Sequence, residues 1–296
     1  MTATEPELVL DLRCELGESP VWLPAEQVLV FVDIKRRRLH RFDPVSERHD
    51  GFGLPEEIGC VAPAKEGGFV AGLRSGIWQL DDAGQPAAML AENPEDAKTH
   101  RFNDGCIDPA GRFWLGTLDE TKQAGDAHLY RFDRRGLTRV EGGLMTSNGA
   151  AFSPDGRFMY HSDTPRRTIY RYDYDAATGT ASNRQIFAKW EIAGDDLGRP
   201  DGGAVDAEGC YWSALYEGGR IRRYSPQGEI LAEYQVPAKC PTMIAFGGRD
   251  LRTLFITTAR SGRPADELSE FPHSGGLFAM QVETPGLPKP PFDPES

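Results

Sequence analysis

The stretch "DGGAVDAEGCYW", residues 201–212, places an acid at the head of an apolar run and then turns back through "DAEG". The same frame occurs in "NDGCIDPAGRFW", residues 103–114, and in "NGAAFSPDGRFMY", residues 148–160. In each copy an apolar residue stands four positions after the first residue, and Asp or Ser follows it just before the turn. Recurrence of one such unit indicates a repeat architecture.

Strand-like runs of this kind recur along the whole chain, at intervals of about 40 to 50 residues. They are "VLVFVDI", "GFVAGL", "RFWLGTL", "FMYHSD", "CYWSAL" and "TLFITT". Each is followed by a second run with polar flanks, such as "RRLHRFDP", and Gly, Asp or Pro stands at the bend. Six such hairpin units with this spacing predict an all-β fold, a six-bladed β-propeller formed by residues 1–296 as a single domain. The ring should close by pairing "ELVLDL" (7–12) with "GGLFAMQV" (275–282), because an open ring would expose sheet edges.

Charge and composition argue against several classes of partner. The chain has 45 Asp plus Glu against 33 Lys plus Arg, a net charge of −12, which is unsuited to nucleic acid or an anionic membrane. It has no run of about 18 apolar residues and no secretory signal in "MTATEPELVLDL". Five scattered cysteines without a CxxC pair indicate free, buried thiols. We therefore expect a cytoplasmic monomer or weak homo-oligomer that binds neither nucleic acid nor membrane.

The first positions of the six units should form a ring, because each heads the innermost strand of its blade and innermost strands line the central channel. They are Glu18, Gly59, Asn103, Asn148, Asp201 and Thr242. Any one Asp or Asn here is also a good turn former. As a set, however, two carboxylates beside amide carbonyls suit a hard divalent cation, because a buried carboxylate needs a partner. The predicted fold class is thus a six-bladed β-propeller with a central metal-binding channel.

The chain resembles the SMP-30/gluconolactonase/LRE family, which includes regucalcin-like sugar-acid lactonases, along essentially its whole length. The resemblance is carried by "LGESPVW", "FVDIKRRRLHRFDP", "RFNDGCIDPAGRFWLGT", "SNGAAFSPDGRFMYHSDT", "PDGGAVDAEGCYWSALYEGGRIRRYSPQGE" and "FGGRDLRTLFITTAR". It implies a six-bladed propeller and a hydrolase of sugar lactones such as pentono- or hexonolactones. It also implies one divalent cation, with Ca²⁺ first and Zn²⁺, Mn²⁺, Mg²⁺ or Fe(II) as alternatives.

The resemblance further implies roles for particular residues. Glu18 of "GESP", Asn148 of "SNG" and Asp201 of "PDG" are the metal ligands that it implies. Arg101 and Asn103 of "RFNDG" face the substrate, and Glu120 of "GTLDE" lies at the pocket rim with Asp119 beside it. The lid-like segment 121–128 varies in length among relatives, so it leaves the preferred lactone undefined.

The residue types fit lactone hydrolysis, which requires a polarised carbonyl, a delivered water and a stabilised oxyanion. Asp201 is the predicted catalytic base, and Glu18 is the other candidate. Water acidified by the ion itself is a third source of the nucleophile. No GxSxG motif or Cys–His pattern indicates a competing nucleophile. Arg101 suits bidentate contacts to sugar oxygens, although a surface salt bridge is its alternative interpretation.

Two other functions remain open at this point. One is a non-enzymatic propeller that binds a cation or a partner, because the fold alone does not define function. The other is a related metal hydrolase acting on other lactones or phosphotriesters. Arg101 and Asn103 favour a polyhydroxylated substrate over both. The histidines are interpreted as structural at His100 and His161, and as loop or solvated-face residues at His40, His49, His128 and His273.

Overall fold

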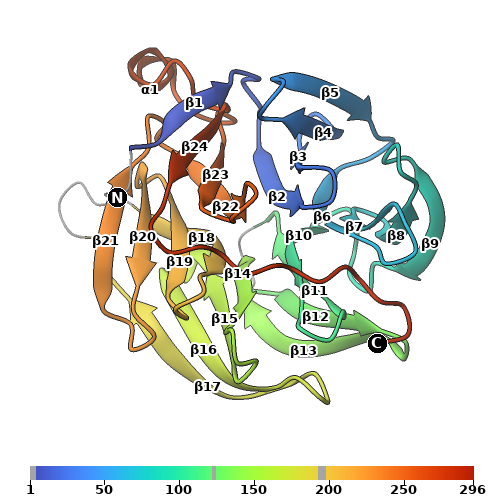
Figure 1. Cartoon of the computed structure of the whole chain (residues 1–296). Coiled ribbons are helices and arrows are strands. Elements are labelled where there is room, and N and C mark those ends of the chain that lie inside the picture. The colour runs from blue at the N-terminus through green and yellow to red at the C-terminus, as the bar shows by residue number, and fades with distance from the viewer. Residues whose placement is uncertain (1–4, 122–124, 193–197) are drawn as a thin grey trace.

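The computed structural model describes residues 5–121, 125–192 and 198–296 and consists of six four-stranded antiparallel sheets arranged as a ring (Figure 1). The first blade consists of β2 (Gly17–Leu23), β3 (Val28–Asp33), β4 (Arg38–Asp43) and β5 (Arg48–Gly53). The second consists of β6 (Ile58–Pro63), β7 (Phe69–Leu73), β8 (Gly76–Leu80) and β9 (Pro86–Glu92). The third consists of β10 (His100–Ile107), β11 (Phe113–Asp119), β12 (Ala127–Asp133) and β13 (Gly136–Leu144). The fourth blade consists of β14 (Ser147–Phe152), β15 (Phe158–Asp163), β16 (Thr168–Asp175) and β17 (Thr180–Lys189). The fifth consists of β18 (Arg199–Val205), β19 (Tyr211–Tyr216), β20 (Arg220–Tyr224) and β21 (Ile230–Gln235). The sixth consists of β22 (Pro241–Gly247), β23 (Thr253–Thr258), β24 (Leu277–Gln281) and β1 (Glu7–Leu10). The predicted six-bladed propeller is confirmed.

The ring closes through the N-terminal strand, as the sequence predicts. β1 pairs antiparallel with β24, so that Glu7 lies opposite Ala279 and Leu8 opposite Phe278. The last blade is therefore built from both ends of the chain, and β1 completes it as the outermost of its four strands.

The C-terminal segment runs across one face of the ring (Figure 1). It bridges Gly286 to Asp206 in the fifth blade and Phe292 to Ala64 in the second. The Phe292 ring also stacks on Phe132, with centroids 5.8 Å apart. The segment thus ties non-adjacent blades together at that end of the channel.

Burial falls from the channel outward. The innermost strands β2, β10 and β22 are buried at every residue, whereas the outermost strands such as β9 are largely exposed. Large side chains fill the space between blades; Trp114 of the third blade, for example, lies edge-on to Phe152 of the fourth at 5.8 Å. This gradient explains why inner strands read as continuous apolar runs and outer strands as polar ones.

The repeated turn that identifies the fold is held by a buried acid. In the third blade Asp108 accepts hydrogen bonds from the Trp114 indole N–H at 3.1 Å and from the Tyr174 hydroxyl at 2.5 Å. In the fifth blade Asp206 accepts one from the Trp212 indole N–H at 2.8 Å. The spacing of Asp and Trp in the repeat therefore has a direct structural cause.

The chain contains little helix. Among the described residues there is one short α-helix, α1 (Ala265–Glu270), and one 3₁₀ turn, η1 (Thr164–Arg166). Within those same residues no helix has the length and apolar character needed to cross a bilayer.

Candidate metal and substrate site

The six positions predicted to form a ring lie at equivalent places in the structure. The innermost strands contact one another in ring order, and each has a register shift. The shifts lie between Glu18 and Val21, Ile58 and Cys60, Phe102 and Gly105, Asn148 and Ala151, Pro200 and Gly203, and Pro241 and Met243. Every shift contains one of the six predicted positions, and such an irregularity re-aims the side chain that it carries.

Two of the irregularities use left-handed backbone directly after a candidate ligand. Ser19 follows Glu18 with φ of 46°, and Gly149 follows Asn148 with φ of 61°. The Ser19 hydroxyl also accepts a hydrogen bond of 2.9 Å from the Val61 N–H in the next blade. The strained conformation at Ser19 is therefore held by a contact between blades.

The two positions that lack an acid or amide have other tasks. At Gly59 a Cβ would clash with the Phe102 carbonyl and approach the Asn103 carbonyl oxygen to 2.7 Å, so only glycine fits. Thr242 donates a hydrogen bond of 2.5 Å to the carbonyl of Gly17, the residue before Glu18. The candidate ligands therefore come from the first, fourth and fifth blades.

Glu18 and Asp201 are buried acids whose basic neighbours, Arg101 for both and Arg199 for Asp201, lie beyond ion-pair distance. Their exposed fractions are 7% and 6%, and neither forms an ion pair within the described part of the chain. Burial raises the pKa of both carboxyl groups well above the ordinary range. The charge of Asp201 raises the pKa of Glu18 further, which places the two carboxylates near each other. Such a pair calls for a cation.

Asn148 is fixed in orientation by its neighbours. Its amide nitrogen donates to the Thr164 hydroxyl at 2.7 Å and hydrogen-bonds to Asp201, where it lowers the pKa of that acid. Its amide oxygen accepts a hydrogen bond of 2.6 Å from the amide nitrogen of Asn103. The oxygen keeps a second lone pair, so Asn148 can still serve as a neutral ligand.

Arg101 is a buried residue, and the alternative interpretation of a surface salt bridge is wrong. It is 3% exposed, and its terminal nitrogen donates to the Asn103 side-chain oxygen at 2.8 Å. Its Nε lies 3.9 Å from a Glu120 oxygen and has no hydrogen-bond partner among the described residues. Burial lowers the pKa of this guanidinium. Arg101 thus offers an unused buried donor beside the candidate ligands.

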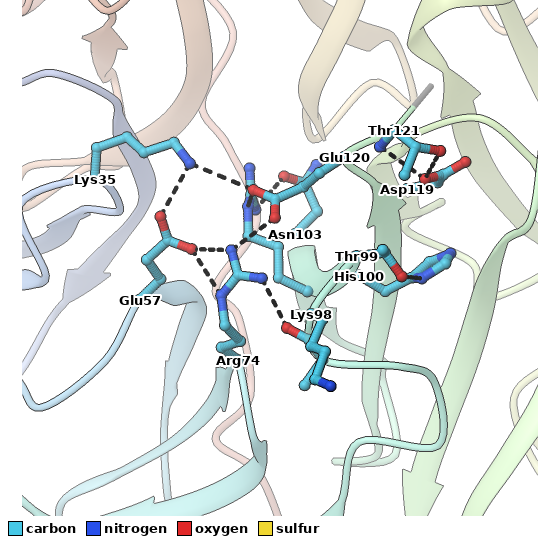
Figure 2. A network of polar contacts seen from close by, with 12 residues as sticks. Lys35, Glu57, Arg74, Lys98, Thr99, His100, Asn103, Asp119, Glu120 and Thr121 are labelled. Carbon is cyan, nitrogen blue, oxygen red and sulfur yellow. Dashed lines mark hydrogen bonds and ion pairs between the residues drawn. The ribbon is translucent and has the colours of Figure 1, made fainter. Parts of the chain in front are cut away.

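Glu120 lies at the end of β11, where several basic side chains surround it (Figure 2). Its carboxylate accepts hydrogen bonds from Arg74 at 2.9 Å and Lys35 at 3.4 Å. Asp119, by contrast, accepts from the backbone and hydroxyl of Thr121 and caps the following turn. Of the lid-like segment 121–128, residues 122–124 lie outside the described residues.

Sequence reasoning missed Asp104, the second residue of "NDG". Its carboxylate accepts hydrogen bonds from the N–H of Gly105 at 2.7 Å and of Gly149 at 2.6 Å. Burial raises its pKa to about 6. Asp104 therefore holds the irregular backbone that follows Asn148. The feature of the sequence that could have pointed to it is an acid directly after Asn103.

The histidines play no part in this site. His161 is fully buried, lies 2.7 Å from the Ser147 hydroxyl, and has a pKa lowered to about 3 by burial. His100 contacts Thr99. The interpretation of His40 as a solvated residue is wrong, because it is buried and stacks on Phe31 with ring centroids 5.0 Å apart.

The opposite half of the channel holds a cavity of about 470 Å³. It is lined by later residues of the inner strands, including Val21, Ala150 and Ala204, and is covered by Leu287 and Lys289 of the C-terminal segment. None of the candidate ligands lines it. The cavity is largely apolar and lies apart from the polar chemistry.

The donor set fits one hard divalent cation. Within the described ranges no three Asp, Glu, His or Cys side chains converge on one point, so the candidate set is two carboxylates and one amide oxygen. The two acids are buried and form no ion pair among the described residues, and the third oxygen, that of Asn148, is neutral and held in place. Oxygen ligands of this kind are those that Ca²⁺ and similar ions take.

Comparisons with known proteins agree with this picture. A family model described as the SMP-30/gluconolactonase/LRE-like region matches residues 16–260. A 6-deoxy-6-sulfogluconolactonase of Pseudomonas putida is 50% identical over 278 residues, 94% of each chain. The pentonolactonase XacC of Haloferax volcanii is 37% identical over 98% of this chain and 97% of its own. Among solved structures, a regucalcin of Agrobacterium tumefaciens, described as a calcium-binding protein, superposes with a TM-score of 0.92 at 28% identity, covering 99% of this chain and 98% of its own.

Proposed function

Because the chain belongs to the SMP-30/gluconolactonase/LRE family, we propose that it is a metal-dependent hydrolase that opens the lactone ring of a sugar acid. The observation that carries the proposal is the pair of buried acids Glu18 and Asp201, which form no ion pair within the described part of the chain, beside the fixed amide of Asn148. Polar donors from Arg101 and Asn103 adjoin them. Two relatives over nearly the whole chain are named as lactonases, which supports the same reaction.

The metal site of this proposal consists of Glu18, Asn148 and Asp201, with Ca²⁺ as the first candidate ion and Zn²⁺, Mn²⁺, Mg²⁺ or Fe(II) as alternatives. When bound, the cation supplies Lewis-acid polarisation of the lactone carbonyl and stabilises the developing oxyanion. Asn103 holds the Asn148 oxygen through its 2.6 Å hydrogen bond. Asp104 holds the backbone at Gly149 from the other side.

Asp201 is the proposed general base. Its carboxylate takes a proton from the attacking water as the water oxygen forms a bond to the carbonyl carbon. The bond from that carbon to the ring oxygen then breaks, and the ring oxygen receives the proton held by Asp201 to become a hydroxyl, which returns Asp201 to its carboxylate form.

Arg101, Asn103 and Glu120 are the proposed substrate contacts. The unpartnered Nε of Arg101 is a buried donor, and an occupant that accepts from it relieves an unsatisfied group. Glu120 is 29% exposed at its side chain and accepts hydrogen bonds from sugar hydroxyls. Such donors and acceptors favour a polyhydroxylated lactone over an apolar one.

The setting proposed for this reaction is the cytoplasm, with the chain acting as a monomer or weak homo-oligomer. All five cysteines are free and buried. Free thiols of this kind are typical of proteins in a reducing compartment.

A panel of lactones tests the proposal. The protein is stripped with a chelator, reloaded separately with each of the five ions, and assayed for acid release from glucono-, galactono-, xylono- and arabinonolactone. The name of the Pseudomonas relative adds 6-deoxy-6-sulfogluconolactone to the panel. We expect ring opening above the spontaneous rate only with an ion present. Equal rates with and without ions would refute metal dependence, and no opening of any lactone would refute the function.

A further inference from the structure

Three charged side chains beside Arg101 and Glu120 have no part in the reaction described above: Lys35, Glu57 and Arg74. Lys35 lies in the turn after β3, Arg74 in the turn after β7, and Glu57 just before β6. Lys35 contacts Glu57 at 2.9 Å, and Arg74 Nε donates to Glu57 at 3.0 Å. Both basic side chains also reach Glu120 (Figure 2). We call Lys35, Glu57, Arg74, Arg101 and Glu120 the rim cluster.

The rim cluster has an excess of positive charge. It contains three basic side chains, Lys35, Arg74 and Arg101, and two acids, Glu57 and Glu120. This surplus occurs in a chain whose net charge is −12, so it is a local exception to the protein's charge. A partly buried positive site attracts an anion more strongly than the same charge in open solvent.

A single residue, Asn103, links the rim cluster to the candidate metal ligand Asn148. Asn103 lies 2.6 Å from Asn148 on one side and 2.8 Å from Arg101 on the other. The Arg101 Nε is in turn 3.9 Å from Glu120, which Lys35 and Arg74 contact. A sugar held by Arg101 and Asn103 with its lactone carbonyl at Asn148 therefore extends its far end toward Lys35 and Arg74.

An anion at the cluster would compete with Glu57 and Glu120, to which Lys35 and Arg74 already donate hydrogen bonds. The Lys35 side chain is 39% exposed, so its ammonium group can turn toward a substrate. Arg101 has a buried Nε without a hydrogen-bond partner among the described residues. Guanidinium groups present paired donors that match the geometry of sulfonate, phosphate and carboxylate oxygens.

We propose that Lys35, Arg74 and Arg101 form a subsite for an anionic group carried by the sugar at the end remote from the lactone. The inference rests on the proposed lactonase function and deepens it: the substrate class is an acidic aldonolactone, bearing a sulfonate, phosphate or carboxylate. The alternative role of the cluster is to position Glu120 and nothing more. The two roles differ in whether they discriminate between charged and neutral lactones.

The test compares kcat/KM for 6-phosphogluconolactone with kcat/KM for gluconolactone in the metal-loaded protein. Charge-assisted hydrogen bonds predict a preference for the charged lactone of about 10-fold or more. Lys35→Gln should lower this ratio about 5- to 10-fold, mainly through KM of the charged lactone, and Lys35→Arg should keep it. Raising the ionic strength should also lower the ratio, because Lys35 is exposed.

Arg48→Gln is the matched control, because it removes one positive charge from the same blade at an outer strand. It should leave the ratio unchanged. A wild-type ratio at or below one, or a ratio unaffected by Lys35→Gln, would overturn the subsite while gluconolactone is still hydrolysed. Failure to open these two lactones or any lactone of the panel above would instead overturn the proposed function, and the subsite with it.

Discussion

Replacing Asp201 by Asn separates the possible roles of the acid at the centre of the site. The substitution keeps the shape of the side chain and one carbonyl oxygen, and the position is only 6% exposed. It removes the negative charge and the capacity to take a proton. The hydrogen bond with Asn148 can be retained through the remaining carbonyl oxygen.

The expected loss has two parts. Removal of a general base costs about 10²- to 10⁴-fold in turnover. The site of Glu18 and Asp201 also drops from two formal negative charges to one. A unit charge and a divalent cation about 4 Å apart attract by about 8 kcal/mol at an effective dielectric constant of about 20. Desolvation of the cation and the carboxylate offsets part of this attraction, so cation affinity should fall by at least about 10²- to 10³-fold.

The assay measures gluconolactone hydrolysis by Asp201→Asn across a range of cation concentrations. If Asp201 is both ligand and base, excess cation restores binding but leaves turnover at least about 10²-fold below wild type. Asp155→Asn is the matched control, since Pro154 and Gly156 give it the same "PDG" context in a surface turn. We expect that control to retain full activity. Full recovery of Asp201→Asn at high cation would refute the base, and near-wild-type activity without added cation would refute both roles.

Three further substitutions test the framework around the site. Gly149→Ala should destabilise the fold by about 2 kcal/mol or more and reduce activity, because φ is 61° at this residue and the new Cβ would clash with the Tyr211 hydroxyl. A change under about 0.5 kcal/mol in the free energy of unfolding, measured by urea denaturation, would contradict this. Asp108→Ala should cost about 3 to 5 kcal/mol, since Trp114 and other buried donors lose their acceptor; an unfolding midpoint close to wild type would contradict it. His161 has a pKa of about 3 when folded against 6.5 when unfolded, so its unfolded form gains a proton first and the protein loses about 2 kcal/mol between pH 7 and pH 5. His161→Gln should remove that part of the pH dependence, and identical unfolding curves against pH in both proteins would disprove the assignment.

The repeat in the sequence was sufficient to predict the fold and the ring of six positions. Its frame of an acid or amide, an apolar residue and a turn corresponds to a backbone irregularity in each inner strand. The two exceptions, Gly59 and Thr242, had reasons that no single sequence displays. One makes room for the carbonyls of the next blade, and the other binds the backbone of Gly17 across the ring closure.

The rest of the site depended on contacts between distant parts of the chain. Lys35 and Arg74 stand in surface turns of polar sequence, where nothing local distinguishes them from solvated residues. Their proximity to Glu120 arises because three blades converge at the channel mouth. The burial of Arg101 could not be predicted from its local sequence either, because a charged side chain usually lies at the surface.

The most direct test of the central claim is a crystal structure of the protein grown with Mn²⁺ or Ca²⁺, with the ion located by anomalous scattering. We predict one strong peak in the channel, with oxygens of Glu18, Asn148 and Asp201 each about 2.0 to 2.6 Å from it. A channel without a peak, or a peak whose ligands exclude Glu18 and Asp201, would contradict the account.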